Sequence, residues 1–153
     1  MNHKYLRLTS SFNSIYFYYF FSIKNKNIHE CILGLFLLPN CIILSQFFWN
    51  NPIKNSLIHK LDSIFAKTTI LYSSIYNLFI KKTTLYYKLE YFFLLICLVY
   101  FAKNSHYYSS IEWCSINHLY NHSFIHLIMI FGTIITFLES RMELNIPNSN
   151  PII

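Results

Sequence analysis

The sequence predicts an all-α fold, a helical membrane protein with two to four transmembrane helices and one basic amphipathic helix. Two observations lead to this prediction. Of the 153 residues, 54% are apolar and only 12% are charged, about half the share usual in soluble domains. The charges also bunch between long neutral stretches, as they do when helices cross a lipid bilayer and loops join them. The bilayer is therefore the first expected partner, and a membrane is the expected location.

The composition also indicates an AT-rich gene. Residues with AT-rich codons are abundant, with 15 Phe and 13 Tyr, whereas the chain contains only 2 Gly. Apolar runs in such a sequence arise partly from codon bias, so they carry less information than usual. Because membrane helices pack closely through small side chains, this scarcity also argues against a tightly packed transporter or channel core.

Residues 1–30 are expected to form a short aromatic span or an interfacial anchor. The uncharged part, Leu8 to Ile23, ends in the run IYFYYFFSI and is flanked by Lys4, Arg7 and Lys24. It is shorter than the roughly 20 residues that a helix needs to cross the hydrocarbon core. A signal peptide is disfavoured, because no small-residue cleavage site follows the aromatic run.

Residues 31–53 are the first segment long enough to cross, and a transmembrane helix is expected there. Pro39 falls inside it and is tolerated where neighbouring groups satisfy the carbonyl that it frees. Trp49 is expected at the membrane interface, where tryptophan is enriched.

Pro39 followed by Gln46, Phe47, Phe48 and Trp49 resembles the opening of mitochondrial ATP synthase subunit 8. The likeness covers about a dozen residues and lies far from the start of the chain, where that family carries the motif. Asn50 to Lys54 stand where the family continues into its apolar span, so the likeness does not assign the chain to it.

Residues 54–90 are expected to form a basic amphipathic helix. Between Leu57 and Leu89, apolar residues step by alternating fours and threes, which is a heptad pattern. Lysines follow one flank of this stripe: Lys60, Lys67, Lys81 and Lys88. Such a helix lies in a membrane surface or packs on a partner. A loop is the alternative, because Thr68, Thr69, Thr83 and Thr84 weaken helix propensity.

Three further segments complete the chain. Residues 91–103 are expected to form a short transmembrane segment, with a start near residue 83 as the alternative, and residues 113–138 a full transmembrane helix. Residues 139–153 are expected to form a disordered tail. Because lysine gathers between the second and third spans, that connection is expected on the cytoplasmic or matrix side.

Cys114, His118, His122 and His126 form a ladder with four-residue spacing. His118 and His122 are the candidate metal ligands, because side chains four apart share one helical face. Successive rungs also rotate around the helix, so the whole ladder cannot close around one ion, and zinc would need further ligands. Haem would need a histidine on a facing helix. Chance spacing is therefore favoured, and no cofactor is expected; a pH-sensitive patch is the remaining interpretation.

Nothing in the sequence predicts an enzyme. Gly34 and Gly132 cannot build a glycine-rich phosphate loop, and no G-x-S-x-G motif is present. The net charge of +6 arises from lysines beside apolar segments and indicates anionic lipid rather than nucleic acid.

Three hypotheses of function stay open. The first is a non-catalytic multi-pass membrane protein translated from an AT-rich open reading frame without a selected role. The second is an accessory membrane subunit of an organelle respiratory or ATP synthase complex. The third is a metal- or haem-binding membrane redox protein.

Overall fold

The computed structural model describes residues 4–143, and the side chains of residues 4–138. All regular secondary structure in this part of the chain is helical, which confirms the predicted all-α fold. The helical segments, in chain order, are α1 (Lys4–Phe12), η1 (Asn13–Ile15), α2 (Tyr16–Ser22), α3 (Ile28–Cys31), η2 (Ile32–Leu37), α4 (Leu38–Asn50), α5 (Leu57–Ile75), η3 (Tyr76–Ile80), α6 (Leu85–Ile111) and α7 (Ile116–Glu143).

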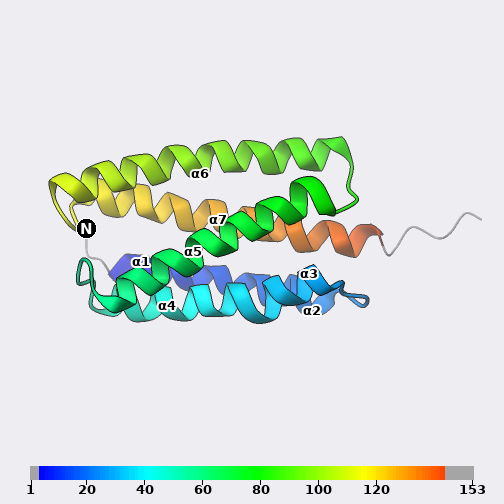
Figure 1. The fold of residues 1–153 in the computed structure, drawn as a ribbon, viewed down its shortest axis with the longest axis horizontal. Helices are drawn as coiled ribbons and strands as arrows, with labels where there is room; N and C mark the ends of the chain where they lie inside the picture. Colours follow the sequence, from blue (N-terminus) through cyan, green and yellow to red (C-terminus); the bar gives the residue numbers. More distant parts are fainter. Residues whose placement is uncertain (1–3, 144–153) are drawn as a thin grey trace, which may run out of the picture.

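The helices run along the long axis of an elongated bundle (Figure 1). The connections α4–α5 and α6–α7 lie at the same end as the start of α1, and the connections α2–α3 and α5–α6 lie at the other end. α6 and α7 form an extensively packed antiparallel pair, while α4 packs against α1 and α5. α5 crosses the bundle diagonally, from one end to the other.

Three helices of the described chain are long and apolar enough to cross a membrane, namely Ile28–Asn50, Leu85–Ile111 and Ile116–Leu138. They correspond to three of the expected segments, with shifted ends. The short segment expected at 91–103 is part of a longer helix, and α7 continues five residues into the expected tail. The rest of that tail, residues 144–153, lies outside the described residues.

The first span begins at Asn27 because a capping box satisfies its free amide groups. The side chain of Asn27 accepts a bond from the backbone N–H of Glu30 at 2.9 Å, and the Glu30 carboxylate accepts one from the backbone N–H of Asn27 at 3.0 Å. This reciprocal pair fixes the start of α3, a few residues before the expected boundary.

Pro39 does not break this span, because the preceding turn widens. Ile32–Leu37 is π-helical, and a proline ring would clash with the carbonyl four residues earlier in a regular α-helix. Asn40 then donates to the carbonyl of Phe36 at 2.7 Å, which satisfies a backbone acceptor in the same turn.

The amphipathic helix expected through Leu89 is interrupted, and this corrects the expectation. Helical structure ends at Ile80, Lys81 is extended, and α6 begins only at Leu85. Two causes favour the break. The pair Thr83 and Thr84 has low helix propensity. The ammonium group of Lys81 is turned inward, where it donates to the carbonyl of Thr136 at 2.5 Å and the residue is 6% exposed.

α5 separates the lysines on either side of it. Lys54 lies in the connection before α5 and Lys81 in the connection before α6, and these connections lie at opposite ends of the bundle (Figure 1). Lysine content alone therefore does not orient the chain across a membrane. The apolar stripe of α5 is exposed, with Leu57 at 71% and Leu71 at 63%, whereas Thr69 on the other face is buried.

Polar side chains occupy much of the bundle interior. Buried polar residues are nearly as common as buried apolar ones in the described chain, and large apolar residues dominate its surface. Glu30 accepts from the hydroxyl of Tyr76 at 3.0 Å, and Asn27 donates to the same hydroxyl at 2.8 Å. Asn77 donates to the hydroxyl of Thr136 at 2.9 Å. These bonds tie η3 to α3 and to α7.

The closest approach between helices occurs at Gly34. Tyr16 donates from its hydroxyl to the carbonyl of Gly34 at 3.1 Å, and the ring of Phe20 covers the Cα atom. A Cβ atom on Gly34 would lie 2.3 Å from Cδ2 of Phe20, and Phe20 is itself buried and 1% exposed. Glycine is therefore required here for α2 to reach η2.

We expect Gly34→Ala to destabilise the bundle by about 1–3 kcal/mol, because an added methyl group in a packed site forces neighbours to move. Gly132→Ala is the matched control, since its Cβ would meet only Tyr91 at 3.7 Å, an ordinary contact. Thermal unfolding of the detergent-solubilised chain, followed by circular dichroism, measures both. Equal midpoints for the two variants would refute the close approach.

Candidate functional site

A cavity of about 500 Å³ lies inside the end of the bundle where α5 and α7 begin. Side chains from α1, α4, α5, α6 and α7 line it. Lys54, Lys67 and His106 line the cavity and are also exposed, so the cavity reaches the molecular surface beside α5 and α6. Its volume falls within the range of about 300–1,000 Å³ that is usual for small-ligand sites.

Two histidines enter the cavity from matching helix starts. Asn55 and Cys114 have φ values of 64° and 61°, and each precedes a serine that caps its helix. Ser56 accepts from the backbone N–H of His59 at 3.2 Å. Ser115 accepts from that of His118 at 3.3 Å.

The histidine side chain in each pair also accepts a hydrogen bond from the backbone. The backbone N–H of Asn55 donates to Nδ1 of His59 at 3.0 Å, and that of Cys114 donates to Nδ1 of His118 at 3.2 Å. The arrangement is similar to a capping box, with histidine in the place of glutamate. Since Nδ1 accepts in both rings, the neutral imidazoles carry their proton on Nε2 and can donate from it.

Trp113 lies between these two histidines. Its ring centroid is 5.3 Å from that of His59 and 4.9 Å from that of His118. Its indole N–H donates to the carbonyl of Pro52 at 3.0 Å, and the ammonium of Lys54 lies 5.5 Å from its ring. Lys54 also donates to the carbonyl of Ser109 at 2.8 Å, which joins the α4–α5 connection to α6.

The predicted ladder reaches this cavity from α7. The ring centroids of His118 and His122 are 5.9 Å apart, and those of His122 and His126 are 5.2 Å apart. All three residues line the cavity. Cys114 precedes the helix instead of forming its first rung, and it is absent from the lining.

The metal interpretation of His118 and His122 gains no further ligands. Within residues 4–143, no group of three or more histidine, cysteine, aspartate or glutamate side chains is placed to hold a metal ion. His59 was not among the candidate site residues, and it lines the same cavity from α5. The S-x-x-H spacing at 56–59 and 115–118 is the signal that points to both histidines.

Three buried polar atoms on the cavity wall have no hydrogen-bond partner. They are Oγ of Ser10, Oγ of Ser45 and Nε1 of Trp49, and these residues are 1%, 5% and 0% exposed. Buried polar groups are nearly always paired with protein or water, because leaving one unpaired costs about 1–3 kcal/mol. All three residues line the cavity, but the atoms themselves are enclosed by protein, so their unpaired state marks imperfect packing of the cavity wall.

The lining of the cavity carries charged groups of both signs. Lys54 and Lys67 contribute positive charge to the lining, and Asp62 contributes a carboxyl group. Burial raises the pKa of Asp62 to about 7. Burial also lowers the pKa of His59, and the positive charges of Lys54 and then Lys67 lower it further. Near neutral pH the lining is therefore rich in hydrogen-bond donors and bears a net positive charge.

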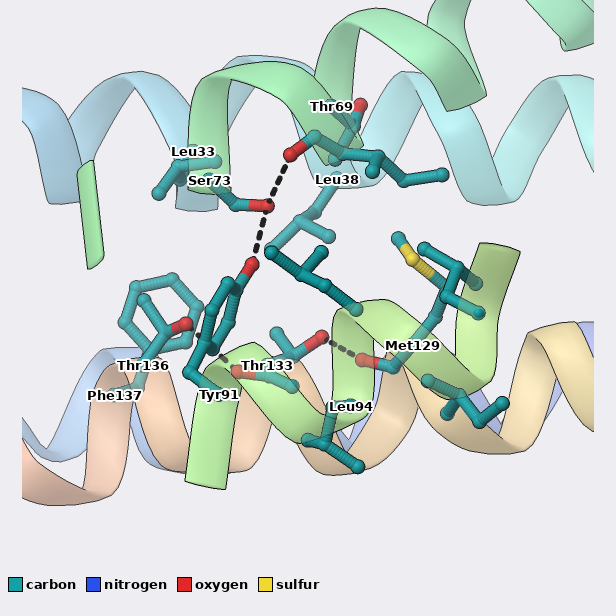
Figure 2. Close-up of a pocket in the computed structure, with 15 residues that line it drawn as sticks. Leu33, Leu38, Thr69, Ser73, Tyr91, Leu94, Met129, Thr133, Thr136 and Phe137 are labelled. Atoms are coloured by element: carbon teal, nitrogen blue, oxygen red, sulfur yellow. Dashed lines mark hydrogen bonds between the residues drawn. The ribbon is translucent and has the colours of Figure 1, made fainter. Parts of the chain in front are cut away.

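A second, mainly apolar pocket continues from the cavity along the bundle. The two hollows share Leu38, Ile70 and Met129. Figure 2 shows this pocket between Thr69 and Ser73 of α5, Tyr91 and Leu94 of α6, and α7 residues around Met129. Its few polar groups bond to one another or to the backbone, as when Tyr91 donates to Ser73 at 2.9 Å. Its surface is mostly apolar, and its volume is only about 30 Å³.

No protein-family model, no curated protein sequence and no solved structure matches this chain.

We expect Asp62 to lower the stability of the fold as the pH rises from about 4 to about 7, by on the order of 2 kcal/mol. The folded-state pKa of Asp62 lies above its unfolded value of 3.8, so the folded protein holds a proton that the unfolded chain releases in this range. His59 acts in the opposite direction, because its lowered folded-state pKa costs stability as the pH falls, so the contribution of Asp62 is measured as a difference between proteins. Asp62→Asn should gain stability relative to the wild type as the pH rises, and Glu112→Gln, which lies outside the cavity, should follow the wild type. Denaturation midpoints of the three proteins between pH 4 and 8 test this. A wild-type slope retained in Asp62→Asn would contradict it.

Proposed function

We propose that this chain is a multi-pass integral membrane protein that performs no chemistry of its own, with the lipid bilayer as its principal partner. The observation that carries the proposal is the distribution of side chains, with large apolar residues over most of the exterior and nearly as many polar as apolar residues in the interior. A water-soluble bundle of this size would hold the opposite arrangement.

The exterior of α6 illustrates the argument. Phe92, Phe93, Ile96, Val99 and Tyr100 are between 52% and 63% exposed, although they occupy the middle of a 27-residue helix. Soluble monomers rarely expose a continuous apolar patch of more than a few hundred Å². Acyl chains are the environment in which such a surface has no cost, and this helix is long enough to cross them.

The interior supports the same proposal. Lipid provides no hydrophobic force between helices, so membrane bundles rely on close packing and on hydrogen bonds between helices. Here the bonds from Asn77 to Thr136 and from Tyr76 to Glu30 join segments that are distant in sequence. Serine and threonine hydroxyls also bond to carbonyls in their own helices, as Thr69 does to Phe65 at 2.7 Å.

The absence of a catalytic role rests on the sequence. With 2 Gly in the chain there is no phosphate-binding loop, and the motifs that position a nucleophile beside a base are lacking. The proposal is therefore a structural or binding role within the membrane rather than a reaction.

We expect Ile96→Lys to impair membrane insertion strongly and Ile111→Lys to impair it little. The two isoleucines lie on the same helix and are 53% and 66% exposed, but Ile96 is central and Ile111 is the last residue of α6. A lysine at a helix centre costs about 2.5–3.5 kcal/mol, whereas one near the end can extend its ammonium to the interface.

The insertion of α6 is measured with glycosylation sites placed on either side of it in microsomes. In parallel, extraction of the full chain with alkaline carbonate should leave it in the membrane pellet. Recovery of the chain as a compact monomer in detergent-free buffer would refute the proposed function.

A further inference from the structure

The cavity has the features of a binding site for an amphiphile. Ser10, Ser45 and Trp49 line it from the α1–α4 side, with their polar atoms enclosed by protein. On the opposite wall, His118, His122 and His126 come from α7. Lys54 and His59 line the cavity at the start of α5, so a polar group near them has charged and hydrogen-bonding partners.

The donors favour an anionic group. Nε2–H of His59 and of His118 is a hydrogen-bond donor and not an acceptor, because Nδ1 of each neutral ring already accepts from the backbone. The ammonium of Lys54 carries three N–H groups, of which one is used by Ser109. The helices α5 and α7 both start beside this group of residues, and helix N-termini favour negative charge. Asp62 is the carboxyl group of the lining, and burial favours its neutral form.

The cavity also favours an apolar chain. Its surface is mostly apolar, and Leu38, Ile70 and Met129 are among its lining residues. The adjoining pocket beside Leu94 and Leu98 has a volume of only about 30 Å³, so it does not extend the space for a chain. Because the cavity is about 500 Å³, one acyl chain fits this space and a two-chain phospholipid does not.

We propose that the cavity binds a single-chain amphiphile with an anionic headgroup. The headgroup lies among Lys54, His59 and His118, and the chain lies along the apolar lining of the same cavity, which includes Leu38, Ile70 and Met129. The inference rests on the proposed function, since a protein in the bilayer meets such molecules in the surrounding lipid. The mouth beside Lys67 and His106 is the route of entry.

The chain contains its own reporter for this binding. Trp49 and Trp113 are its two tryptophans, and both line the cavity. The full chain is reconstituted in phosphatidylcholine nanodiscs and titrated with dibromostearic acid, whose bromine atoms quench indole fluorescence on contact. We expect saturable quenching that unlabelled stearic acid reverses. Dibromostearyl alcohol, which has the same chain without the charge, should quench only in proportion to its content in the bilayer.

Paired variants locate the headgroup. Lys54→Gln should weaken binding about tenfold or more, because it removes a charge-assisted hydrogen bond. Lys60→Gln removes the same charge from an exposed position outside the cavity and should leave the affinity unchanged. Circular dichroism confirms that both variants remain folded. Competition with unlabelled acid needs no variant, so the test does not depend on either substitution.

Further probes separate the sources of the anion. A lysophosphatidate that competes as well as stearate identifies the site as selective for charge and chain, whatever the headgroup. Competition by inorganic phosphate alone would show a site for a free anion and would overturn the inference. Equal, non-saturable quenching by the acid and the alcohol would also overturn it. Flotation of the same nanodiscs tests the proposed function separately, because a protein that does not float with them is not a membrane protein.

Discussion

Hydrogen bonds between buried polar side chains hold this bundle in its arrangement. Tyr76 bonds to Asn27 and Glu30 of the α3 start, and Asn77 in the same segment bonds to Thr136 of α7. Their partners lie 46–59 residues away in sequence, so the bonds fix the relative positions of helices that are distant in the chain. Leaving one such group unpaired in an apolar interior would cost more than the bond itself contributes.

The spans could be predicted from the sequence, because length and hydropathy alone decide whether a helix can cross a bilayer. The first span lies within about a turn of its expected position at each end, and the deviation comes from the Asn27–Glu30 capping box. The orientation of α5 could not be predicted. Periodicity identifies an apolar face and a polar face, but which one points inward depends on the surrounding medium and on the partners of Thr69 and Lys81.

The cavity could be predicted only in part. The ladder from His118 to His126 indicated one wall, since four-residue spacing places these side chains on one helical face. His59 is 59 residues away from His118 in the chain. No local sequence pattern predicts that both rings contact Trp113. The scarcity of glycine and alanine suggested loose packing. Serine, threonine and one glycine, Gly34, provide the close approaches instead.

The matching starts of α5 and α7 make the local backbone structure depend on pH. In each, a backbone N–H donates to Nδ1 of a histidine, which is possible only while that nitrogen holds no proton of its own. If either imidazole gains a proton on Nδ1, this N–H and the backbone N–H face each other as two donors. The hydrogen bond that holds the ring at the start of its helix is then lost. Because both rings rest on Trp113, the loss of one contact loosens the other. Acidification would therefore release the starts of α5 and α7 together.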